Sequence, residues 1–86
     1  MLLGYNISVP TVARIKGFRF FFFSNEAKEP FHINVESDDK YAKFWMDPVH
    51  LAKSVGYSAK ELRELRNMLM ENADVFRRRW NEYFSH

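Results

Sequence analysis

The sequence contains no cysteine and only three glycines among its 86 residues. The absence of cysteine excludes a disulfide scaffold, a thiolate zinc site and catalysis by a thiol, and it is compatible with a reducing compartment. Three glycines also leave no glycine-rich loop of the kind that holds a phosphate group. These absences remove several common classes of small secreted protein and nucleotide-binding enzyme.

The sequence also lacks a strong charge of either sign and a long apolar segment. Thirteen Lys and Arg against 11 Asp and Glu leave a net charge of +2, which neither demands nor forbids nucleic acid binding. The longest purely apolar run is residues 20–23, whereas a membrane-spanning helix needs about 20 apolar residues. The apolar start at residues 1–3 has no cationic segment before it, so it does not match a secretory signal. We therefore expect a cytoplasmic protein that does not enter a membrane.

Aromatic residues are abundant in this chain. They make up 17% of the sequence, nine of them are Phe, and 47% of all residues are hydrophobic. This composition excludes disorder and provides enough apolar area for one small core. We expect residues 10–86 to form a single domain. Residues 1–9 are expected to form an arm or an extra strand, since Tyr5, Ile7 and Val9 alternate with polar residues.

The first half of the chain has the alternation that is typical of strands. Residues 10–16 form one segment, and five of the six residues in 18–23 are aromatic. Residues 31–36 and 40–46 alternate between apolar and polar side chains, and the turn-forming residues 37–39 join them. Short connections of this kind favour antiparallel pairing. The pattern predicts a small antiparallel sheet of three to four strands.

The alternation also divides these strands into two faces. We assign the more apolar face to the core, and its members are Phe31, Ile33, Val35, Ala42, Phe44 and Met46. The opposite face then carries polar and aromatic side chains, which are His32, Asn34, Glu36, Tyr41, Lys43 and Trp45. On the preceding strand, Phe18, Phe20 and Phe22 share one face, while Arg19, Phe21 and Phe23 share the other.

The hydrophobic period changes at Asp47 and Pro48. Asp47 is a favourable N-cap and Pro48 suits the first helical position, so we expect a short helix from here to about Val55, ended by Gly56. This prediction places His50 on a helix.

A stronger signal follows at residues 58–61, where Ser, Ala, Lys and Glu form a capping box. Apolar positions then recur at three-to-four spacing to the C-terminus, which is the pattern of an amphipathic helix. Residues 72–74 are a candidate break, but the apolar stripe keeps its phase through them, so we favour one long helix. Strands followed by helices predict an α+β fold, with the short and the long helix packed on one face of the sheet.

The polar and aromatic sheet face is the candidate functional surface. Its aromatic rings can stack on a ligand, His32 can transfer a proton, and Arg19 and Lys43 can contact an anion. The predicted binding residues are Arg19, His32, Asn34, Glu36, Tyr41, Lys43 and Trp45. The alternative interpretation is an ordinary solvated sheet face, which antiparallel sheets often have.

His32 is the main candidate for chemistry, because an imidazole titrates near neutral pH and also binds metals. A metal site needs further ligands nearby, but Asn34 is a poor zinc ligand and Glu36 lies about 6–7 Å further along the strand. The sequence shows no carboxylate partner for His32. We therefore expect no metal and no cofactor, and a structural or merely exposed role for this ring is the favoured interpretation.

Several short segments together match a known pattern. They are Pro10-Thr11-Val12, Arg14, Gly17-Phe18, Ser24-Asn25-Glu26, Pro30 to Val35, Ala42 to Trp45 and Trp80 to Phe84. Through these segments, residues 10–84 resemble the family called domain of unknown function 4160, whose members are small bacterial proteins.

The chain departs from that family pattern at two positions. The family segment Pro-Pro-His-x-His-Val has Phe31 here in place of its second Pro and Asn34 in place of its second His. Asn34 keeps a hydrogen-bond donor and an acceptor, but it cannot transfer a proton. A histidine-dependent activity of the family would therefore be weakened or altered in this chain.

The resemblance implies a gene pair similar to toxin–antitoxin modules. On this basis we expect an interaction component that binds a small partner protein, with nucleic acid as an open second ligand, and we lean towards a protein that is not an enzyme. One alternative is a small metal-independent ribonuclease that uses His32 with Arg14, Arg19 or Lys43. A second alternative is a structural homo-oligomer, such as a homodimer, without catalysis.

Overall fold

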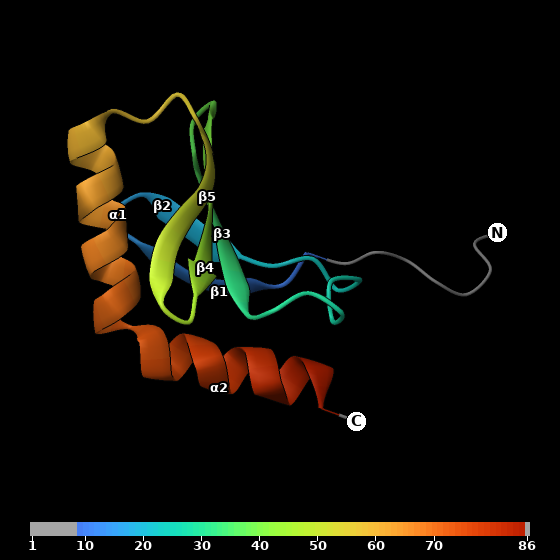
Figure 1. Ribbon diagram of the computed structural model, residues 1–86. Coiled ribbons are helices and arrows are strands. Elements are labelled where there is room, and N and C mark those ends of the chain that lie inside the picture. The colour runs from blue at the N-terminus through green and yellow to red at the C-terminus, as the bar shows by residue number, and fades with distance from the viewer. Residues whose placement is uncertain (1–8, 86) are drawn as a thin grey trace, which may run out of the picture.

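A computed structural model describes residues 9–85, which form a five-stranded antiparallel sheet followed by two helices (Figure 1). Each strand pairs with the next one in the chain, so the sheet order is β1-β2-β3-β4-β5. The strands are β1 (Thr11–Ile15), β2 (Phe18–Phe21), β3 (His32–Ser37), β4 (Lys40–Met46) and β5 (Val49–Val55), and the helices are α1 (Ala59–Glu71) and α2 (Ala73–Phe84). The predicted α+β class is confirmed, with five strands instead of three to four. Most of the predicted arm, residues 1–8, lies outside the described residues.

Short turns explain why successive strands pair. Ile15 pairs with Phe18, so only Lys16 and Gly17 form the turn between β1 and β2. These two residues have φ angles of 52° and 84°. Positive φ at both central positions is the pattern of a type I′ turn, whose twist matches that of the flanking strands, and glycine adopts it without steric cost.

The short helix predicted after Asp47 is wrong, because residues 49–55 form strand β5. Met46 pairs with Val49, and the cis peptide bond between Asp47 and Pro48 lies in the turn between β4 and β5. Asp47 does not cap a helix here; its carboxylate forms an ion pair with Arg77 of α2. Pairing along β4 satisfies the backbone of this segment, and that tertiary contact overrides the local capping signal.

The capping box at the start of α1 is confirmed. The backbone N–H of Glu61 donates to Ser58 Oγ at 3.1 Å, and the backbone N–H of Ser58 donates to Glu61 Oε1 at 2.9 Å. This reciprocal pair satisfies two backbone donors that the first helical turn leaves without partners.

The prediction of one long helix is wrong, because the helix breaks at Asn72. This residue has φ −109° and ψ 12°, and its side-chain amide donates to the carbonyl of Met68 at 2.8 Å. An asparagine side chain that binds a nearby carbonyl competes with the helical backbone. Figure 1 shows α1 and α2 running in different directions from this point.

Both helices pack against the face of the sheet that the apolar alternation assigned to the core. All six residues of that predicted set are buried, together with Phe20 and Phe22 of the preceding segment. The helices contribute Leu65, Met68, Leu69, Phe76 and Trp80 to the same cluster. None of the helices in residues 9–85 has the length and apolar character that crossing a membrane requires.

Replacing Ser58 with alanine is expected to lower the free energy of unfolding by about 1 kcal/mol, because the first turn of α1 loses the side-chain acceptor for a backbone N–H. Urea unfolding at 25 °C measures the change. Ser54→Ala in the exposed strand β5 is the matched control and should change stability by less than about 0.5 kcal/mol. Equal losses in the two variants would contradict a stabilising role for this cap.

Candidate functional site

The seven predicted binding residues alternate with the core set and so share the opposite face of the sheet, although His32, the first residue of β3, also contacts Trp80 of α2. We call this opposite face the outer face. Strand register places the residues in opposed pairs, which are Arg19 with Glu36, Glu36 with Tyr41, Asn34 with Lys43 and His32 with Trp45. His32 and Asn34 are only 0% and 1% exposed, in contrast to an open, solvated face.

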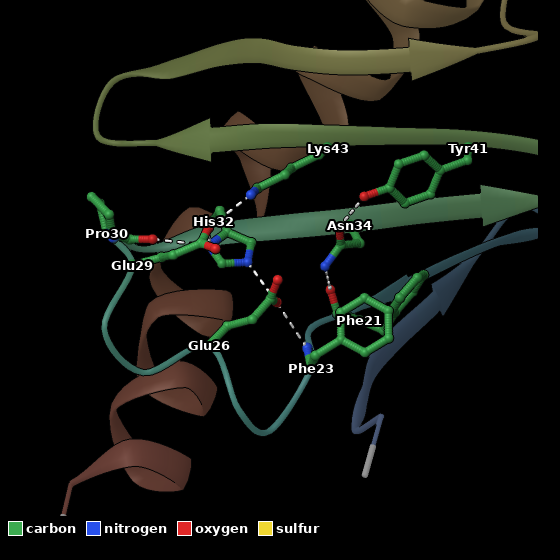
Figure 2. Close-up of polar contacts among 9 residues, drawn as sticks. All are labelled: Phe21, Phe23, Glu26, Glu29, Pro30, His32, Asn34, Tyr41 and Lys43. Atoms are coloured by element: carbon green, nitrogen blue, oxygen red, sulfur yellow. Dashed lines mark hydrogen bonds and ion pairs between the residues drawn. The ribbon is translucent and has the colours of Figure 1, made fainter. Parts of the chain in front are cut away.

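The loop of residues 22–31, between β2 and β3, accounts for the environment of His32 (Figure 2). His32 Nε2 lies 2.7 Å from Glu26 Oε1, and His32 Nδ1 lies 2.9 Å from the carbonyl oxygen of Pro30. A neutral imidazole has only one N–H to donate, whereas here both ring nitrogens face oxygen acceptors. Both ring nitrogens are therefore engaged, Nδ1 by a carbonyl oxygen and Nε2 by a carboxylate oxygen.

Further contacts hold this loop against the outer face. Glu26 Oε1 also accepts the backbone N–H of Phe23 at 3.1 Å. Glu29 accepts from Lys43 Nζ at 2.7 Å, and this hydrogen bond lowers the pKa of the Glu29 carboxyl. The loop is thus connected to β3 through one carboxylate and to β4 through the other.

Aromatic rings enclose the imidazole on two sides. The ring centroid of His32 lies 5.7 Å from that of Trp45 and 5.1 Å from that of Trp80. Trp80 belongs to α2, so the buried ring joins the sheet, the loop and the second helix. The hydrogen bonds of a ring in such surroundings meet little competition from water.

Asn34 is fixed by a second set of contacts on the outer face (Figure 2). Its side-chain nitrogen donates to the carbonyl of Phe21 at 3.4 Å, and its oxygen accepts from the Tyr41 hydroxyl at 2.5 Å. Burial raises the pKa of Tyr41, which keeps its hydroxyl a donor at neutral pH. Asn34, which stands where the family pattern has its second His, therefore forms hydrogen bonds through both the nitrogen and the oxygen of its side-chain amide.

A metal site was not expected, but the fold does gather a group of metal-ligating types. One ligand atom each from Glu26, Glu29 and His32 lie within 4.8 Å of one another. A tetrahedral ion bonded to Nε2 and Oε1 at about 2 Å would hold these atoms more than about 3 Å apart. The observed 2.7 Å is the length of a charge-assisted hydrogen bond, and Nδ1 is turned to Pro30. The observed distance between His32 and Glu26 therefore fits a hydrogen bond better than two ligands of one metal ion.

The inference that His32 has no carboxylate partner is wrong, because the carboxylates of Glu26 and Glu29 both lie near its ring. The sequence does show two glutamates in a polar loop that ends at Pro30. That signal does not say which way the loop folds. Only the closure of residues 22–31 over β3 brings the carboxylates to the imidazole.

The two candidate catalytic residues lie apart. Arg14 is exposed on β1 opposite Arg19, which in turn lies opposite Glu36 of β3. His32 is four positions from Glu36 along that strand, or roughly 13 Å at about 3.3 Å per residue. The structure therefore does not bring Arg14 to His32, and the buried imidazole has no exposed surface for a substrate.

Arg19 has its hydrogen-bond donors occupied within the fold. It donates to Glu36 Oε2 at 2.9 Å, to Thr11 Oγ1 at 2.8 Å and to the carbonyl of Val9 at 2.9 Å. Its guanidinium also lies 4.5 Å from the ring centroid of Phe21, within the range of a cation–π contact. These contacts give Arg19 a role in joining β1, β2 and β3.

These observations define a small α+β protein with a five-stranded meander, two C-terminal helices and a loop closed over a buried histidine that contacts a partly exposed glutamate. Residues 17–81 match the model of the family described as Domain of unknown function (DUF4160), and the chain belongs to this family. The matched range includes the loop and the four strands β2 to β5. No curated protein and no solved structure gave a significant match to the chain.

Replacing His32 with alanine is expected to lower the free energy of unfolding by about 3 kcal/mol. The change removes the contacts of the ring with Glu26 and Pro30, leaves the Glu26 carboxylate with the Phe23 N–H as its donor, and opens a cavity beside Trp80. Urea unfolding measures the loss. His50→Ala, at an exposed position on β5, is the control, and a loss below 1 kcal/mol for His32→Ala would contradict a structural role.

The pair of Glu29 and Lys43 predicts a loss of stability in acid. A carboxyl whose pKa is lowered by folding stabilises the protein above its ordinary pKa of 4.5, and this contribution is lost as pH falls through the lowered value. The ion pair of Glu29 and Lys43 should contribute no more than about 1 kcal/mol to the free energy of unfolding, because it is partly exposed. Urea unfolding of wild type and Glu29→Gln should differ at pH 7 and converge near pH 3. A constant difference would contradict this assignment.

Proposed function

We propose that this protein is the interaction component of a toxin–antitoxin-like gene pair and that it binds a small partner protein along strand β5. The proposal is carried by one observation, namely that β5 lies at the edge of the sheet and every residue after Val49 is exposed. An edge strand has backbone N–H and C=O groups without partners, and these can pair with a strand of another chain.

The side chains of β5 support the same proposal. Leu51 and Val55 are large apolar residues that are 41% and 54% exposed. They lie opposite Phe44 and Tyr41 of β4, so they belong to different faces of the sheet. An added strand would cover both residues and continue the sheet.

A bulge limits which strands can be added. The pairing of β4 with β5 shifts register after Lys43, so Ala52 is an additional residue on β5. Bulges and lysines on edge strands discourage indiscriminate pairing between sheets. This favours a partner whose shape and charge match the edge.

The two alternative functions have less support from the geometry. A ribonuclease that uses His32 needs the imidazole at a surface, whereas the ring is buried and both its nitrogens are engaged. A homodimer would use the same edge of β5. The oligomeric state in solution therefore separates a second copy from a different partner.

Val55→Lys is expected to weaken binding of the protein encoded by the neighbouring gene at least about tenfold, which corresponds to about 1.4 kcal/mol. The reason is that a charge would have to be buried in the paired edge. Met70→Lys is the matched control, since Met70 is 51% exposed but lies on α1. Leu51→Lys and Val75→Lys, both at positions that are 41% exposed, repeat the comparison on the core face of β5 and on α2.

Isothermal titration of the full chain with this neighbouring protein measures the affinities, and light scattering of the free chain reports its oligomeric state. Weakening in the β5 variants alone supports the proposal. Equal weakening in the helix variants would place the interface elsewhere. No binding by the wild-type protein would overturn the proposed function, and a dimer that Val55→Lys dissociates would favour the homo-oligomer.

A further inference from the structure

The outer face of the β4–β5 hairpin combines aromatic and cationic side chains in a defined order. Strand register gives three cross-strand pairs on this face, which are Tyr41 with Val55, Lys43 with Lys53 and Trp45 with His50. The middle pair places two lysines directly opposite each other, next to two aromatic residues of β4. Strand β5 itself contains no Asp or Glu.

Like charges that face each other across antiparallel strands destabilise the pair, since their Cβ atoms are only about 5 Å apart. Lys43 has a counter-ion, because its ammonium lies 2.7 Å from Glu29 Oε1. Lys53 has none among residues 9–85, and it is exposed at the edge of the sheet. Of these two opposed lysines, Lys43 is therefore ion-paired and Lys53 is not, within residues 9–85.

A carboxylate on an added strand would complete this charge arrangement. We propose that the partner segment is an extended strand that places an Asp or Glu next to Lys53 and an apolar side chain next to Val55. This inference rests on the proposed function and names the chemistry of its ligand. Side chains of an added strand alternate between faces, so both contacts fall on the outer face at a spacing of two residues.

An extended polypeptide fits this site better than a nucleic acid. The backbone groups at the edge of β5 can form a ladder only with another polypeptide strand. Nucleic acid binding draws on several cations that contact successive phosphates, whereas the chain has a net charge of only +2 and Lys43 is already paired.

The experiment selects twelve-residue peptides from a random phage-displayed library on the immobilised full-length protein. The preferred sequences are then synthesised, and their binding is measured by fluorescence anisotropy. We expect enrichment of peptides that alternate β-branched residues with Asp or Glu. Enrichment of peptides without acidic residues, or no enrichment at all, would overturn the inference.

Variants of Lys53 then test the contact itself. Lys53→Gln should weaken the selected peptide about fivefold or more, and Lys53→Glu should abolish binding until the peptide's acidic residue is changed to Lys. Lys60→Gln is the control, because Lys60 is exposed on α1 and has no ion pair among the described residues. Equal effects of Lys53→Gln and Lys60→Gln would overturn the proposed contact. Circular dichroism and thermal unfolding verify that each variant is folded.

Two further measurements separate the outcomes. A labelled 20-nucleotide single-stranded RNA is titrated with wild type and Lys53→Gln, and a loss of RNA binding without a loss of peptide binding would overturn the inference in favour of nucleic acid. The neighbouring protein is titrated with the same variants. If it binds through β5 but ignores Lys53→Gln, the inference fails and the proposed function stands. If it does not bind while acidic peptides do, the proposed function fails, and of the inference only the preference of β5 for an acidic strand stands.

Discussion

Both nitrogens of the buried His32 ring face oxygen acceptors, which are the Glu26 carboxylate and the Pro30 carbonyl. One acceptor, Glu26, comes from the loop of residues 22–31, and the ring itself packs on Trp80 of α2. The loop, the first position of β3 and the second helix are therefore held together at one point. Loss of either group would remove the loop's contact with β3 and leave the ion pair of Glu29 with Lys43 to hold the loop to β4.

Closure of this loop divides the outer face into two parts. Near β2 and β3 the polar side chains bind one another, as in the contacts of Asn34 with Phe21 and Tyr41. Near β5 the edge is exposed, and Lys53 has no carboxylate partner within residues 9–85. His32, which first suggested catalysis, is thus engaged within the fold, and the exposed edge of β5 carries the contact that we propose. Membership of the DUF4160 family assigns no activity to the chain.

Several elements could be read from the chain because their signals are local. Alternation identified β3, β4 and the buried set on their shared face, and the capping box identified the start of α1. Two other local signals gave wrong predictions, one of a helix start and one of an unbroken helix. Asp47 and Pro48 have the residue types of a helix start, yet they form the turn before β5, since β4 offers that segment a hydrogen-bonding partner. The apolar stripe stayed in phase through Asn72, although the side chain of this residue ends α1.

The amino-acid pattern alone therefore accounts for the α+β class, the core face of the sheet and the set of polar residues on the opposite face. Hydrophobic periodicity and capping depend on neighbours within about one helical turn or two strand positions, so they are visible in the sequence. The pairing of Glu26 with His32, the fifth strand and the exposed lysine at its edge arise from contacts across the fold. Such contacts depend on how the loop and the last hairpin close in three dimensions, which no local spacing encodes.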